Sequence, residues 1–130
     1  MKKKISSWFL VGTLLAMTVP TAAHHSVTGA FDVDDKFEIT GRIAEVEWVN
    51  PHVYIHMDVQ SETGETERWA LETSPTQFFR NAGVSKSMLE GDGGLTTITG
   101  IRGRDKSLLV GFIIRITYED GRFIHVTDRF

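Results

Sequence analysis

The decapeptide Ser74-Pro-Thr-Gln-Phe-Phe-Arg-Asn-Ala-Gly83 decides the fold, because it predicts one short helix in a chain that otherwise has the pattern of strands. Ser74 is expected to cap this helix, the proline after it suits the first helical position, and the glutamine three residues after Ser74 completes a capping box. Phe78 and Phe79 are expected on the buried side, and Gly83 is expected to end the helix.

The chain before this helix predicts three strands. Residues 37–48 alternate apolar and polar side chains, but the apolar parity changes after Ile43, which indicates one long, bent strand with a bulge. Residues 61–65 contain a glycine suited to a hairpin turn, and the third strand returns through residues 66–71.

The second strand, residues 53–59, shows the clearest alternation in the chain. Its odd-numbered residues are apolar, so we predict that they face the interior, whereas Tyr54 and His56 do not. The odd-numbered set is Val53, Ile55, Met57 and Val59.

Two further strands follow the helix, at residues 95–101 and 108–118, and a turn then leads into residues 123–126. In the fifth strand, one side is expected to carry Val110, Phe112, Ile114 and Ile116. Five strands with a helix between the third and fourth is the order of an OB-type barrel, so we predict an all-β domain with an OB-like barrel. The alternative is a small open sheet or sandwich of the same strands.

The N-terminal residues have the pattern of a secretory signal peptide. Lysines 2–4 precede an apolar run over residues 8–19, and small residues follow at 21–23. A helix of twelve residues rises only about 18 Å, which is too short for a bilayer core of about 30 Å. We therefore expect a signal peptide at 1–23, an N-terminal segment at 24–36, a barrel domain at 37–130 and no transmembrane segment in the mature chain.

The composition limits the cellular compartments and the classes of binding partner that suit this protein. The 130 residues include no cysteine, which excludes disulfides and thiolate chemistry. Removal of residues 1–23 takes away three lysines and no acidic residue, so the formal net charge falls from −3 to −6. A domain this acidic repels nucleic-acid backbones and anionic membranes. An exported protein without cysteine suits the bacterial periplasm or secretion.

Several short motifs are distributed along the predicted mature chain. They lie at residues 24–26, 31–32, 40–41, 46–52, 69–72, 74–75, 89–92 and 97–102. With its His-His-Ser start and its Trp-x-Asn-Pro-His motif, the chain resembles a family of small exported bacterial proteins, a domain of unknown function. The resemblance spans the mature chain, and it implies a secreted β-barrel domain without an assigned activity. An additional Gly93-Gly94 pair departs from the family pattern.

Three histidines form a candidate copper or zinc site. His24 and His25 lie at the predicted cleavage point, where a terminal amine and imidazoles could chelate a metal ion. Pro51 fixes the backbone ahead of His52, so the turn is expected to aim this side chain reproducibly. The alternatives are an opportunistic terminal chelator and, at residue 52, a side chain that only caps the turn.

The residues around this turn also form a candidate ligand face. Tyr54 and His56 point outward from the second strand, and Trp48 and Asn50 come just before it. OB barrels use this face, with aromatic platforms, for ligands. His52 and His56 lie about 13 Å apart as strand residues, so they are not expected to chelate one ion together.

We therefore expect an exported, non-enzymatic binding module for an unknown small ligand or for copper or zinc. The alternative is an accessory subunit that docks on a cell-envelope oxidoreductase or transporter. A small hydrolase is disfavoured, because the sequence has no nucleophile elbow, P-loop or dinucleotide motif. In a metal site that includes His52, the N-terminal segment folds over the turn at residues 48–52, and Phe31 is its expected anchor.

Overall fold

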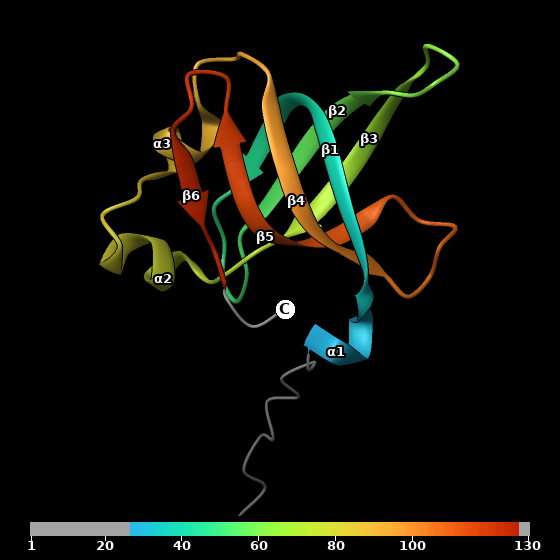
Figure 1. The fold of residues 1–130 in the computed structure, drawn as a ribbon. Helices are drawn as coiled ribbons and strands as arrows, with labels where there is room; N and C mark the ends of the chain where they lie inside the picture. Colours follow the sequence, from blue (N-terminus) through green and yellow to red (C-terminus); the bar gives the residue numbers. More distant parts are fainter. Residues whose placement is uncertain (1–26, 128–130) are drawn as a thin grey trace, which may run out of the picture.

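The structure, a computed structural model, describes residues 27–127, in which short helices accompany six strands (Figure 1). The predicted signal peptide and the histidines at 24 and 25 lie outside the described residues. The elements are α1 Val27–Ala30, β1 Phe31–Glu47, β2 Tyr54–Gln60, β3 Thr66–Glu72, α2 Thr76–Asn81, α3 Lys86–Glu90, β4 Thr96–Gly103, β5 Val110–Tyr118 and β6 Phe123–His125.

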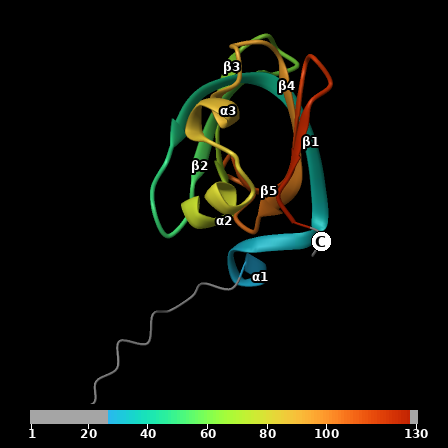
Figure 2. The ribbon, with the colours of Figure 1, turned by 90° about the vertical axis from the view of Figure 1, so that its left-hand side faces the viewer.

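The strands pair in a ring. Antiparallel pairing joins β3 to β2, β2 to β1, β1 to β4, β4 to β5 and β5 to β6. A short parallel pairing between β3 and β5 closes the ring, and Figure 2 shows the strands curving around a common interior. The mostly β class is therefore confirmed, while the predicted count of five strands is wrong, because residues 123–125 pair with β5 as a sixth.

The side chains of β2 that point into the interior are those on the face predicted by the alternation. Val53, Ile55 and Met57 are fully buried, and Val59 is partly buried against the same core. Tyr54 and His56 remain partly exposed, which confirms the prediction for this strand. The core also contains Leu71 and Trp69 from β3, and its remaining members are Val46, Phe79, Leu89, Ile98, Ile113, Ile116, Tyr118 and Val126.

The parity change in β1 is a bulge, as predicted. Ile43 pairs with Met57 and Glu45 pairs with His56, so Ala44 is the additional residue. The strand also begins at Phe31, six residues before the predicted start.

The prediction that one side of β5 carries all four apolar residues is wrong. Thr99 pairs with Arg115 and Gly100 with Ile113, so Ile114 forms a second bulge that reverses the parity of the strand. Ile113 and Ile116 therefore belong to the main core, while Phe112 joins a second apolar cluster.

Two helices, rather than the one expected, lie between β3 and β4. Ser74 does not cap α2, because its carbonyl accepts a backbone hydrogen bond from Val53 and the chain stays extended to Pro75, which is the N-cap. Phe79 is fully buried, but Phe78 is 39% exposed. The second helix, α3, is capped by Ser85, whose hydroxyl accepts a hydrogen bond from the Met88 amide.

The second cluster attaches the start of the described chain to the ring. Phe31 is buried against Phe112, with ring centroids 5.7 Å apart, and Ile101 completes the group. Val27 of α1 packs on the same cluster. Phe31 is thus an anchor, but it packs on β4 and β5 rather than on the turn at residues 48–52.

No helix within residues 27–127 is long and apolar enough to cross a membrane.

The close approach of β1 to β2 depends on Gly41, which leads to a prediction about stability. A Cβ at this position would lie 2.2 Å from the carbonyl oxygen of Asp58, so β1 and β2 would have to separate. Gly41→Ala is expected to lower the free energy of unfolding by about 1–3 kcal/mol in urea denaturation. Gly29→Ala is the control, because a Cβ there meets nothing within 4 Å. Equal stability of the two variants would contradict this account of the contact between β1 and β2.

Candidate functional site

The loop between β1 and β2 is held against α2. The Thr76 hydroxyl donates a hydrogen bond to Asn50 Oδ1 at 2.9 Å, and the Asn50–Pro51 peptide bond is cis. The Trp48 ring packs on Phe79, with centroids 5.8 Å apart, so it belongs to the edge of the core. Asn50 and Trp48 therefore fix the loop that presents His52.

His52 has one ring nitrogen engaged by the protein. Its Nδ1 lies 3.0 Å from the carbonyl oxygen of Thr73 and 3.4 Å from Glu72 Oε1. A carbonyl oxygen only accepts hydrogen bonds, so Nδ1 carries the proton and donates. In the neutral ring, Nε2 then holds the lone pair that a metal ion binds. The His52 side chain is 30% exposed.

Tyr54 shares Glu72 with His52. The phenol of Tyr54 donates to Glu72 Oε2 at 3.5 Å, and these two residues are paired in the register of β2 and β3. Burial raises the pKa of Tyr54, and the negative charges of Glu72 and, to a smaller extent, Glu47 raise it further. The phenol therefore stays neutral and remains a hydrogen-bond donor throughout the physiological pH range.

His56 lies on the same outward face and contacts a carboxylate. Its Nε2 is 2.5 Å from Oε1 of Glu47, a residue of β1. The Glu47 side chain is 44% exposed. Glu45 pairs with His56 in the register and also points outward. We call the five residues Glu47, His52, Tyr54, His56 and Glu72 the outer-face cluster.

Two features of the cluster bear on metal binding. It combines two imidazoles with two carboxylates, which are ligand types suited to copper and zinc. Within residues 27–127, however, no three His, Cys, Asp or Glu side chains converge closely enough to hold a metal ion. His52 and His56 each contact a different carboxylate, in agreement with the expectation that they do not chelate one ion together.

Sequence reasoning missed Glu72 and gave Glu47 no role at a site. The hairpin contained the signal for Glu72. A turn at residues 61–65 places residue 60 opposite residue 66, and continuing this antiparallel pairing along both strands places Tyr54 opposite residue 72. The contact between Glu47 and His56 is diagonal across β1 and β2, so it also depends on the bulge at Ala44.

The shared carboxylate predicts the titration of Tyr54. Glu72→Gln removes the closest negative charge, so the pKa of Tyr54 is expected to fall toward its ordinary value of 10, measured by the ultraviolet absorbance of tyrosinate. Glu47→Gln is the matched control, and its effect should be smaller because the charge of Glu47 contributes less. A larger effect of Glu47→Gln would contradict this assignment.

Comparison with known proteins confirms the resemblance to an uncharacterised family. No curated protein and no solved structure gives a significant match to the chain. The sequence pattern of a family described as a family of unknown function (DUF6152) matches residues 12–108, which is more than half of the chain. The protein is therefore a member of this family of unknown function.

Proposed function

We propose that the protein is an exported, non-enzymatic binding module built on an OB-like barrel. The support for the barrel is the closed pairing order, in which β1 pairs with β2 and β4, and β3 pairs in parallel with β5. The two helices between β3 and β4 occupy the slot where an OB barrel has its helix. The outer-face cluster then lies on the β2–β3 face that OB folds use for ligands.

The proposed ligand is a copper or zinc ion bound by His52 together with the histidines at residues 24 and 25. The observation that carries this proposal is the hydrogen bond from His52 Nδ1 to the Thr73 carbonyl. Metal-binding histidines in proteins characteristically donate their other ring N–H to a carbonyl or carboxylate, which fixes the tautomer and the orientation of the ring. Glu72 Oε1, 3.4 Å from the same nitrogen, would reinforce this orientation.

The path of the chain supports the participation of the terminal histidines. Glu72, next to His52, pairs with Phe112 on β5, and Phe112 belongs to the cluster on which Val27 packs. In both Figure 1 and Figure 2, α1 and the loop between β1 and β2 lie at the same end of the ring. His25 precedes Val27 by two residues, or about 7 Å of extended chain.

The cleavage position decides the chemistry that the terminus contributes. Cleavage after Ala23 makes His24 the first residue, so its amine and imidazole both bind. Cleavage after Ala22 places His25 third, an arrangement in which the amine, backbone amides and imidazole form the square of nitrogens that Cu(II) and Ni(II) favour. Intact mass of the exported protein distinguishes the two termini.

The test is a calorimetric titration of the mature protein with Cu(II) and with Zn(II), which measures the dissociation constant of each ion. His52→Ala and a version with one extra N-terminal residue are each expected to raise the dissociation constant about tenfold or more, because each loses a ligand of the proposed site. His125→Ala is the matched control, since it removes an exposed imidazole from β6. Equal affinity in all four proteins would exclude a site that includes His52.

A second candidate function is that of an accessory subunit of a cell-envelope oxidoreductase or transporter complex. One observation favours it: a cavity of about 280 Å³ between α3 and the turn joining β5 and β6 is flanked by Met88 and Phe123, which are 43% and 57% exposed. Exposed apolar side chains beside a cavity are typical of protein contact sites.

The docking candidate predicts that Phe123→Asp removes the partner without unfolding the protein. The measurement is cross-linking of the affinity-tagged mature protein in the cell envelope. Leu108→Asp is the control, because it also places a charge at an exposed apolar residue. Identical cross-linked products from both variants would exclude docking at this cavity.

A further inference from the structure

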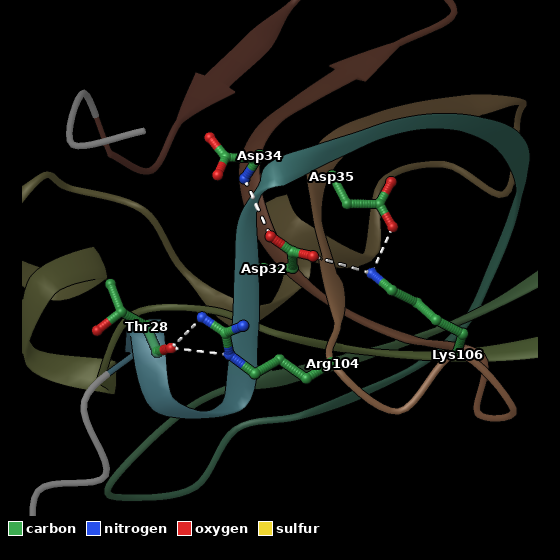
Figure 3. Close-up of polar contacts among 6 residues, drawn as sticks. All are labelled: Thr28, Asp32, Asp34, Asp35, Arg104 and Lys106. Carbon is green, nitrogen blue, oxygen red and sulfur yellow. Dashed lines mark hydrogen bonds and ion pairs between the residues drawn. The ribbon is translucent and has the colours of Figure 1, made fainter.

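Arg102, on β4 beside the loop to β5, is a cation without an acidic partner. The two cationic side chains of that loop are engaged by the protein: Arg104 donates to the carbonyl oxygen of Thr28, and Lys106 pairs with two aspartates (Figure 3). Within residues 27–127, the Arg102 guanidinium forms no ion pair and no hydrogen bond. Every other arginine in this part of the chain is exposed, whereas Arg102 is partly buried.

Aromatic rings hold Arg102 on the inner side of the strands. Its guanidinium carbon lies 4.8 Å from the ring centroid of Trp69, which is 4% exposed. Trp69 packs in turn on Phe37, with ring centroids 5.3 Å apart. The Phe37 ring fits because Gly100 and Gly111 lack side chains, since a Cβ at either position would overlap it. We call Phe37, Trp69 and Arg102 the inner stack.

The inner stack lies toward the end of the ring that the helices leave free. In Figure 1, α2 and α3 lie at one end of the ring, and the loop between β4 and β5 lies at the other. Arg102 is the last residue but one of β4, so it belongs to the end with this loop. Of its nitrogens, only Nε is both buried and unpaired in the described structure, so the two Nη nitrogens remain accessible to a ligand.

The polar groups of the inner stack specify what such a ligand must offer. Arg102 Nε and Trp69 Nε1 are both buried, and neither donates a hydrogen bond to any group in the described part of the chain. Buried polar groups are normally hydrogen-bonded, and both of these groups can only donate. A cation withdrawn from water also requires a negative charge nearby. The missing partner is therefore an anionic acceptor, and a carboxylate matches the planar fork of a guanidinium.

We propose that Arg102, held by Trp69, binds the carboxylate of a small organic acid at this end of the ring. A carboxylate is favoured over a phosphate because Glu67 lies two residues before Trp69, on the same face of β3. Its negative charge repels a dianion more strongly than a monoanion. None of these residues belongs to the outer-face cluster, so the proposal does not depend on the metal site.

The test observes both side-chain N–H groups by NMR of the mature, ¹⁵N-labelled protein, titrated with sodium butyrate. We expect the resonances of Arg102 Nε–H and Trp69 Nε1–H to shift and to reach saturation, because the anion binds beside them. The indole of Trp48 is the internal control, since its ring packs on Phe79 next to the helices and should not respond. Sodium phosphate and sodium chloride at the same ionic strength are the comparison anions.

Two substitutions separate the charge of Arg102 from its shape. Arg102→Gln is expected to raise the dissociation constant of butyrate about tenfold or more, because the charge and the paired donors are lost. Arg102→Lys keeps the charge without the fork, so its affinity should lie between the two. Arg104→Gln is the matched control, since that guanidinium serves a backbone carbonyl, and it should bind butyrate as the unaltered protein does.

Thermal unfolding checks that each variant is folded. If Arg102→Gln fails to fold, Arg102→Lys carries the test, because its aliphatic stem can still pack on Trp69. Equal affinity of the unaltered protein and of the folded Arg102 variants would overturn the proposal. Shifts that chloride reproduces, or that do not saturate, would also overturn it, and tighter binding of phosphate than of butyrate would overturn the assignment to a carboxylate.

Discussion

The parallel pairing of β3 with β5 is the contact on which the rest of the structure depends. It joins Leu71 to Gly111 and Glu72 to Phe112, and without it the strands would form an open sheet with an exposed apolar face. Side chains alternate between the two faces of a strand, so Leu71 points into the core and Glu72, the next residue, points outward. Closure of the ring therefore also places the carboxylate that contacts His52 beside the cluster that anchors the N-terminal segment.

Much of this arrangement follows from local sequence. The alternation of residues 53–59 assigns the inner face, since a shift of one residue would bury Tyr54 and His56. The parity change after Ile43 gives the bulge at Ala44, and the turn at Gly64, with φ of 84°, fixes the register that brings Tyr54 to Glu72. These features are predictable because each depends on residues that are neighbours along the chain.

The rest depends on contacts between distant parts of the chain. Residues 110–116 are almost continuously apolar, so no alternation marks the bulge at Ile114, which only the pairing with β4 reveals. Ser74 has the sequence of a helix cap, but pairing with Val53 keeps it in extended conformation. The tautomer of His52 likewise depends on the Thr73 carbonyl, 21 residues away, and the Trp-x-Asn-Pro-His motif gives no sign of this partner.

The two histidines of the outer-face cluster differ in how firmly they are held, and this difference favours His52 over His56 for the proposed metal site. The acceptor for His52 is a backbone carbonyl at the end of β3, which neither titrates nor changes rotamer. The acceptor for His56 is the half-exposed carboxylate of Glu47, a flexible group that can turn toward water or bind a cation itself. A site gains affinity when its ligands are oriented before the ion arrives. His52 meets this requirement within the described fold, because a backbone carbonyl orients its ring, whereas the ring of His56 depends on the rotamer of Glu47.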